Sequence, residues 1–350
     1  MNSLLISHAR TTPCWVTGKE PVIISSRIRI ARNFAGERFP SWATSDMQLA
    51  QLSRGYEALR KCNGDFHFWQ LRQLAVPERP YFQERRMCGK NFLASGSHVA
   101  IAEMHNLPMQ VRFNDGEHVK ISTIMSGLQL REAHSVVNGV DDEMARYVEF
   151  AFDDKKGYLA AFPENLGTGL RASLLFFLPG LVATERISQI LYAAQTIGCA
   201  IGGFSGTGTE ADGCFFQICN RSSLGESEEE ILRRMHGVGE AIRDQELMAR
   251  RELERTLPEQ LGDRFSRVLG MLTSARCMSF AEALSLLSQA RLAACMEIFP
   301  SELIPTIDAF IVELQPIHLQ LIRNVWITGE RQETLRAEQL RKAFTGIALR

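Results

Sequence analysis

The sequence predicts an α+β protein, in which a mainly antiparallel β-sheet flanked by helices is followed by an all-α C-terminal domain. Several stretches have the alternation or the β-branched content of strands, and crossover helices do not separate them regularly. That spacing argues against a doubly wound parallel sheet. The strand-like stretches are residues 22–30, 109–113, 118–124, 158–161, 199–204 and 214–220.

The domain organisation follows from a change in pattern after about Leu257. Strand signals thin out there, and helical spacing dominates the rest of the chain. We expect a loose leader over residues 1–20, a first domain over residues 21–256 and a helical domain over residues 257–350.

The helices are predicted from caps and periodicity. Thr44, Ser45 and Asp46 form an N-cap cluster for a helix that runs to about Cys62. Later segments have helical spacing, one of them, residues 226–255, being long and charged, and Pro316 is acceptable in a first turn. These segments are residues 128–152, 226–255, 280–296, 315–325 and 331–344.

Composition excludes several classes of protein. The chain has 350 residues with 45% hydrophobic and 23% charged residues and a net charge of -1, so nothing favours nucleic acid or an anionic membrane as a partner. Its longest apolar run, residues 174–182, is too short to span a bilayer, and we expect no signal peptide. The 8 cysteines lack metal-site spacing, so we expect reduced thiols in a cytoplasmic protein and no protein-bound metal site.

Two arginines lie two residues apart on the first predicted strand. A strand has a period of two, so Arg27 and Arg29 point to the same face and can bind phosphate groups together. The alternative is an ordinary solvated strand face. Arg32 is out of this register and is expected to face elsewhere.

A glycine-rich segment, Gly167-Thr168-Gly169, precedes Arg171. Glycines allow backbone amides to approach an anion, and Arg171 would supply charge beside them. No Gly-Lys-Ser/Thr follows, so this is not a P-loop. The alternative is a tight turn before an apolar helix.

Together these two segments resemble the phosphagen (guanidino) kinase superfamily, and most closely its bacterial protein-arginine kinase branch. The segments that carry the resemblance are Ser25–Asn33 and Phe162–Ser173, in this order. The resemblance implies a guanidino-kinase fold, transfer of the γ-phosphoryl of ATP to a guanidinium nitrogen, and ATP with Mg²⁺ as cofactor. It assigns nucleotide binding to Arg27, Arg29, His118, Lys120 and Arg171, and it also carries over Asn220, Leu224, Gly225 and Glu228.

The sequence departs from the family where the chemistry is performed. Gly116 stands where the family has the glutamate that holds and deprotonates the acceptor guanidinium, and Phe162 stands where it has a cysteine. Gly202 replaces a phosphate-binding arginine, and Thr207 replaces a glutamate on the acceptor side. Lys120 replaces another arginine, which keeps the charge but loses the two-pronged hydrogen bonding.

Two carboxylates next to Gly116 are candidates for a substitute base. Asp115 and Glu117 each lie one residue away, although their backbone directions should differ. Asn114-Asp115-Gly116 is also a favourable hairpin turn, so the former catalytic loop is expected to be a turn.

The C-terminal domain retains part of a phosphoarginine-reading motif by resemblance. Glu333 and Arg336 keep its charge pattern one helical turn apart, whereas Gln332 replaces its first arginine. The alternative is a surface ion pair. The apolar content of this domain and the resemblance together predict a homodimer.

Two functions follow as hypotheses. The first is a pseudokinase that acts as a regulator, adaptor or chaperone-like binder of protein clients, because Gly116, Phe162, Gly202 and Thr207 alter three segments of one site. The alternative is an active or weakly active protein-arginine kinase that uses Asp115 or Glu117 as its base.

Overall fold

One eight-stranded antiparallel sheet organises the chain, in the order β2-β3-β4-β5-β1-β8-β10-β9. The computed structural model describes residues 1–18, 20–62, 64–94, 98–104, 108–204 and 212–347. The strands of the sheet are β1 Ile23–Arg32, β2 Phe66–Gln70, β3 Ala100–Met104, β4 Met109–Asp115, β5 Glu117–Ser126, β8 Leu170–Phe177, β9 Cys199–Gly203 and β10 Phe215–Asn220. A separate hairpin pairs β6 Phe152–Asp153 with β7 Gly157–Tyr158.

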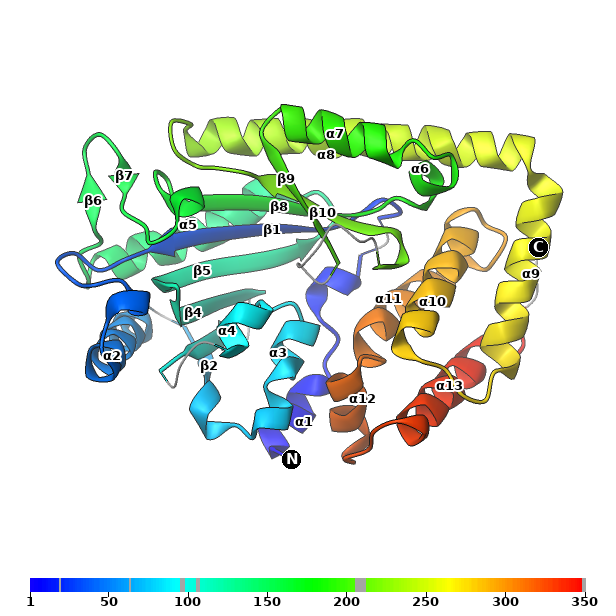
Figure 1. Cartoon of the computed structure of the whole chain (residues 1–350), viewed down its shortest axis with the longest axis horizontal. Coiled ribbons are helices and arrows are strands. Elements are labelled where there is room, and N and C mark those ends of the chain that lie inside the picture. Colours follow the sequence, from blue (N-terminus) through cyan, green and yellow to red (C-terminus); the bar gives the residue numbers. More distant parts are fainter. Residues whose placement is uncertain (19, 63, 95–97, 105–107, 205–211, 348–350) are drawn as a thin grey trace.

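Helices surround this sheet and then continue alone to the C-terminus (Figure 1). The helices of the first part are α1 Ser3–Ala9, α2 Ser45–Lys61, α3 Pro80–Glu84, α4 Lys90–Ala94, α5 Leu130–Ala145, α6 Pro179–Ala183, α7 Ile187–Thr196 and α8 Glu228–Thr256. Those of the second part are α9 Pro258–Ser274, α10 Phe280–Cys295, α11 Ile304–Glu313, α12 Pro316–Arg323 and α13 Glu330–Phe344.

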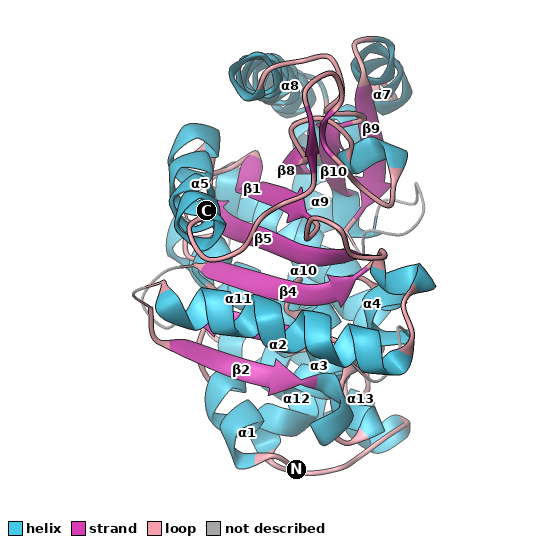
Figure 2. Ribbon diagram, turned by 90° about the vertical axis from the view of Figure 1, so that its left-hand side faces the viewer, coloured by secondary structure: helices cyan, strands magenta, loops and turns pink. Residues whose placement is uncertain are grey.

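The two faces of the sheet have different partners. Figure 2 shows α2 and α5 in front of the strands and the C-terminal helices behind them. Ile28 and Ile30 of β1 point into the first face, where they are fully buried in a core shared with α2, α5 and α8. Arg27 and Arg29 alternate with them and therefore point to the second face. The candidate site lies on this second face.

The N-terminal segment differs from the loose leader that the sequence predicted. Asn2 caps α1 by accepting hydrogen bonds from Leu4 and Leu5. Leu5 and Trp15 are almost fully buried on the second face of the sheet. Leu5 packs in a core with residues of β2 and β3, and Trp15 packs in a core with the C-terminal helices. Burial of these apolar side chains holds the N-terminal segment against the rest of the protein. The sequence did not predict this packing, because the segment is short and has no clear periodicity.

Other elements confirm or correct the predicted ones. The hairpin β4–β5, helix α2 with its Thr44 cap and helix α8 are confirmed. Residues 170–177, where an apolar helix was the alternative to an anion-binding turn, form strand β8 at the centre of the sheet. A strand that is buried on both faces has a continuous apolar sequence, which does not distinguish it from a helix. The turn between α8 and α9 falls at Leu257, beside the expected domain boundary.

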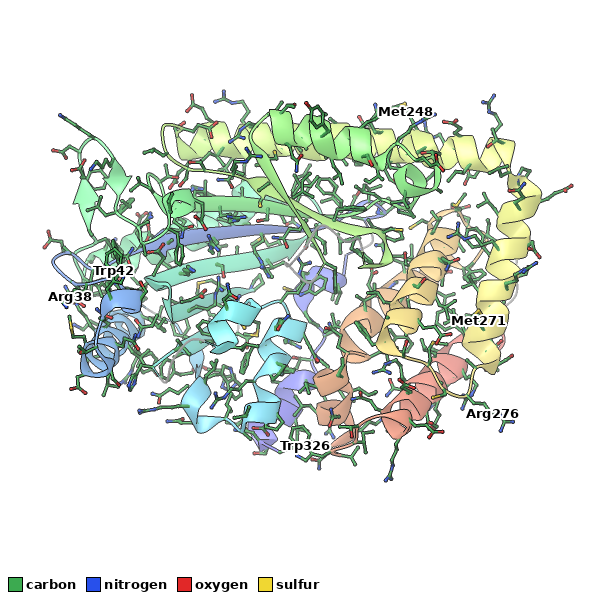
Figure 3. All side chains as sticks on the ribbon, in the orientation of Figure 1. Arg38, Trp42, Met248, Met271, Arg276 and Trp326 are labelled. Atoms are coloured by element: carbon green, nitrogen blue, oxygen red, sulfur yellow. The ribbon has the colours of Figure 1, made fainter. Side chains whose placement is uncertain are left out.

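Exposed apolar side chains are spread over the molecule. Figure 3 places Trp42 beside α2, Met248 on α8, Met271 on α9 and Trp326 near the far end of α12, and all four are substantially exposed.

Within the described residues, no helix is both long and apolar enough to cross a membrane.

Candidate active site

Cationic side chains gather on the second face of the sheet. The register places Arg29 directly opposite Ser122 of β5 and opposite Arg171 of β8. Lys120 lies opposite Arg112 on the neighbouring strand β4. We call Arg27, Arg29, Arg112, Lys120 and Arg171 the cationic cluster.

Asp115 is the carboxylate that the structure places within this cluster. Its Oδ2 lies 2.6 Å from Nη1 of Arg112 and 3.3 Å from Nζ of Lys120. Burial alone would raise the pKa of Asp115, but Arg112 and then Lys120 outweigh it and lower the pKa. The carboxylate is therefore ionised and engaged by two cations.

Positive charge in the cluster is only partly compensated. Burial, and then the charges of Arg171 and Arg112, lower the pKa of Arg29 to about 10. Burial also lowers the pKa of Lys120 to about 8, and Asp115 opposes this effect only in part. The pKa of Arg27 is lowered as well, by burial and by neighbouring arginines. These shifts have the sign expected where an anion would be stabilised.

Several buried polar atoms of this face lack a hydrogen-bond partner. They include Nε of Arg29, Nε of Arg112 and Oγ of Ser122. Arg29 otherwise donates to Oδ1 of Asn165 at 2.8 Å, and Arg171 donates to Sγ of Cys219 at 3.0 Å. Donors that are buried and unpaired are costly, so they point to an acceptor that completes the site.

The position of the expected catalytic glutamate is occupied differently. Gly116 has a φ of +72°, and a Cβ built on it would lie 2.5 Å from Cε2 of Phe162. The Phe162 ring therefore occupies the space into which a side chain at position 116 would extend. The Nζ of Lys120 lies 5.9 Å from the centroid of the same ring.

Glu117, the second candidate base, is fully buried and holds two segments together. Its carboxylate accepts hydrogen bonds from the side-chain amides of Asn33 and Asn165 at 2.7 and 2.8 Å. It also accepts from the backbone N–H groups of Ala161 and Phe162 at 2.8 and 3.3 Å. Four donors occupy this carboxylate, so it positions the loop that carries Phe162.

His118 is also engaged by its surroundings. Its Nδ1 accepts from the backbone N–H of Phe34 at 3.0 Å, and its Nε2 lies 3.0 Å from the carbonyl of Arg38. The ring stacks on Phe34, and burial lowers the pKa of His118. Both ring nitrogens are thus used within the protein.

The glycines of the segment 167–169 allow close backbone packing. A Cβ on Gly167 would lie 2.5 Å from the carbonyl oxygen of Ser223, and one on Gly169 would lie 2.6 Å from that of Ala31. The backbone amides of Gly167 and Thr168 donate to the carbonyls of Tyr158 and Ser223. These two amides are therefore used in holding the turn, and its contribution to the site is the placement of Arg171.

Other predicted residues lie outside the cluster or fall where nothing is described. Arg32 is buried and pairs with Asp141 at 2.6 Å, which confirms that it faces elsewhere. Asn220 is bonded to the backbone around Ala172, and Glu228 lies 2.7 Å from His134. Thr207 lies outside the described residues.

The predicted phosphoarginine-reading pair lies in α13. Arg336 is almost fully buried and donates to the carbonyls of Leu314 and Met278, at 2.9 Å each. Glu333 accepts from Sγ of Cys277 at 3.2 Å. These bonds tie α13 to the neighbouring helices, so Arg336 has a structural role, and its reading of phosphoarginine stays a prediction.

Sequence reasoning missed two arginines of this face. Arg112 could have been found, because the hairpin register places it across from Lys120. Arg86 lies in the loop after α3, where no pattern marks it. Its backbone carbonyl accepts from Arg27, and its guanidinium donates to Gln217 at 2.8 Å.

A cavity of about 580 Å³ lies beside the cationic cluster. The N-terminal segment around Cys14 and Trp15 forms one wall, and Gln110, Ser122 and Ile124 of the sheet form the floor. Ser122 and Ile124 lie opposite arginines of β1 in the register, so the cavity borders the cluster.

Family models cover most of the chain. Residues 52–249 match the ATP:guanido phosphotransferase C-terminal catalytic domain, and residues 258–349 match the protein-arginine kinase McsB C-terminal domain.

Curated relatives match over nearly the whole length. The chain is 36% identical over 340 residues to the protein-arginine kinase of Moorella thermoacetica, covering 95% of this chain and 97% of the relative. It is 32% identical over 341 residues to the protein-arginine kinase of Pelotomaculum thermopropionicum, covering 95% and 96%.

Solved structures share the fold. The duplicated taurocyamine kinase from Schistosoma mansoni with bound transition state analog components gives a TM-score of 0.60 at 20% identity, over 80% of this chain and 40% of that chain. Lombricine kinase gives a TM-score of 0.57 at 20% identity, over 68% of this chain and 70% of that chain. The guanidino-kinase fold predicted from sequence is confirmed.

Glu117→Gln should destabilise the protein. A carboxamide replaces one acceptor oxygen by an N–H donor that would face N–H groups, so we expect the free energy of unfolding to fall by about 1–3 kcal/mol. Urea denaturation measures this change, with Glu149→Gln on the exposed surface as the control. Unchanged stability of Glu117→Gln would show that the carboxylate does not hold the loop.

Proposed function

This chain belongs to the protein-arginine kinase family, and on that premise we propose that it is a non-catalytic member that binds a phosphate-bearing ligand and regulates protein partners. The observation that carries the proposal is the Phe162 ring over Gly116, in the space of the expected catalytic glutamate. Phosphoryl transfer to arginine requires a carboxylate there, because a guanidinium has a pKa above about 12 and its lone pair is otherwise unavailable.

The neighbouring carboxylates do not offer an obvious replacement. Glu117 is occupied by four hydrogen bonds, and Asp115 is paired with Arg112 and Lys120. A carboxylate whose pKa is lowered by two cations is a weak base. A guanidinium at this position would also meet the positive charge of the cluster.

The residues expected to bind phosphate are closer to the family pattern than those expected to bind the acceptor guanidinium. Arg27, Arg29 and Arg171 share one face, where Nε of Arg29 has no hydrogen-bond partner and Arg171 donates only to the thiol of Cys219. Position 202 has open space around it, as expected where a long side chain is replaced by glycine. These features support retained binding of a phosphate chain without its transfer.

A weakly active kinase is the second candidate. Asp115 favours it, because this carboxylate lies on the face of the cluster and remains ionised. In that case Arg112 and Lys120 would have to release Asp115 when an acceptor binds. A homodimer formed through the helical domain stays a prediction under either function.

Incubation with Mg-ATP and an arginine-rich protein substrate should give no phosphoarginine. Loss of a base alone commonly costs about 10²–10⁴ in rate, so we expect a yield below about 1% of that of an active relative. Mass spectrometry under neutral conditions detects the acid-labile N–P bond. The Moorella thermoacetica relative in a parallel reaction is the positive control, and phosphoarginine on either the substrate or this protein would establish the weakly active kinase instead.

Gly116 and Phe162 should be energetically coupled. Gly116→Ala places a Cβ against the ring in a left-handed conformation, which alone costs about 1–2 kcal/mol. With Phe162→Cys in the same chain the contact is removed, so the double variant should be more stable than the sum of the single variants by about 1 kcal/mol or more. Urea denaturation of the four proteins measures the coupling.

Additivity of the two substitutions would contradict this contact. For the same steric reason, Gly116→Glu alone should leave phosphoarginine formation at background. A rise of about 10² from this single substitution would show that the base was the one missing component.

A further inference from the structure

We propose that the cationic cluster binds a polyphosphate chain free of divalent metal, with Arg112 and Lys120 holding its terminal phosphate. The inference deepens the proposed function, on which it rests, by naming the ligand of the site and its charge state. It assigns the side of the site where the family binds a guanidinium to an anionic group instead.

The charge count supports an anion at this position. The cluster contains Arg27, Arg29, Arg112, Lys120 and Arg171, and Asp115 is the carboxylate that the structure places among them. Like charges held close together in a partly buried site repel one another. Binding a polyanion relieves this repulsion.

The residues present do not fit Mg²⁺ well. Magnesium in phosphate sites is commonly held by one or two carboxylates together with substrate phosphates. Asp115 is already paired with two cations, and Glu117 is fully buried and bonded to four N–H groups. Among the described residues, no group of three or more His, Cys, Asp or Glu is arranged to hold a metal.

Arg112 and Lys120 can take over the role of charge neutralisation. Arg112 is almost fully buried, and its Nε has no partner. Lys120 lies opposite it on the neighbouring strand, and both side chains reach Oδ2 of Asp115 on the same face of the sheet. The unpaired Nε of Arg29 and Oγ of Ser122 add donors beside them. A phosphate offers oxygen acceptors that suit this set of donors.

Two ligands could supply this phosphate chain, a nucleoside triphosphate and inorganic triphosphate, and the experiment distinguishes them. Both carry the same phosphate chain, and only the first also needs room for a base and a ribose. Titration calorimetry with ATP and with inorganic triphosphate, each in EDTA and each with excess Mg²⁺, measures the affinities. Equal affinity of the two ligands assigns recognition to the phosphates alone, and tighter binding of ATP assigns additional contacts to the nucleoside.

The expected result is binding of at least one ligand in EDTA, weakened about tenfold or unchanged by Mg²⁺, since the metal lowers the charge of the phosphate chain. A requirement for Mg²⁺, or a tenfold gain in affinity with Mg²⁺, overturns the inference. Absence of binding in all four titrations also overturns it.

Two substitutions in the full chain sharpen the test. Arg112→Gln should weaken binding about tenfold through loss of a charge-assisted hydrogen bond, whereas Arg60→Gln, a matched change on the exposed surface of α2, should have no effect. Asp115→Asn should tighten binding several-fold in EDTA, because it frees Arg112 and Lys120. Weaker binding of Asp115→Asn in EDTA would identify Asp115 as a positioning group for the ligand and contradict the inference. Thermal melting of each variant verifies folding.

Failure of this inference and failure of the proposed function are distinguishable. Phosphoarginine formation by this protein would refute the non-catalytic function, whatever the titrations show. Binding that requires Mg²⁺ without phosphoarginine would refute only the metal-free site.

Binding should also depend on pH through Lys120. Its pKa of about 8 in the free protein reflects burial, with Asp115 and Glu117 opposing the effects of Arg29 and Arg112. A bound anion favours the protonated amine, so affinity should be full below pH 8 and fall as the pH rises through 8 to 9.5, by up to tenfold per pH unit. Lys120→Arg should bind equally well at pH 7 and lose this dependence, and an unchanged profile in that variant would exclude Lys120 as its source.

Discussion

Mutual repulsion among the cations on one face of the sheet is the constraint on which the rest of this site depends. Antiparallel register fixes the spacing of the strand positions that carry these side chains, so their backbones remain adjacent. Arg29 and Arg171 lie directly opposite each other, and each has a neutral acceptor at hand, Asn165 and Cys219. Neutral acceptors satisfy donors but do not cancel charge, which is the physical basis for proposing an anionic ligand at this face.

A second carboxylate beside the site is buried and has a structural role. Glu117 adjoins the site in sequence, but its four hydrogen bonds are directed to the segments around Asn33 and Phe162. It therefore positions the Phe162 ring over Gly116 without reaching the cluster. The frame of the active site is retained in this way, while the side chains that would act on an acceptor are different.

Local patterns predicted the parts of the fold that depend on neighbouring residues. The Thr44 cap and the β4–β5 hairpin follow from a few adjacent side chains. Strand β8, residues 170–177, was missed because burial on both faces removes the alternation that marks a strand. In the site, period two predicted that Arg27 and Arg29 share a face, and the hairpin register could have added Arg112. The contact of Phe162 with Gly116 could not be predicted from local patterns, because it joins segments that are distant in the sequence and meet only in the folded chain.

That contact changes how the departures from the family are counted. A Cβ at position 116 would lie 2.5 Å from the Phe162 ring in its observed position, so the two substitutions are sterically linked and are not counted as independent losses. Phe162 is 43% exposed, so a larger side chain at position 116 alone would require this ring to move toward solvent. The ring also brings an apolar surface beside Lys120, which an arginine acceptor would have to displace. The linked change at positions 116 and 162 leaves Arg27, Arg29 and Arg171 on the same face of the sheet, which is why we propose that this site holds phosphate without transferring it.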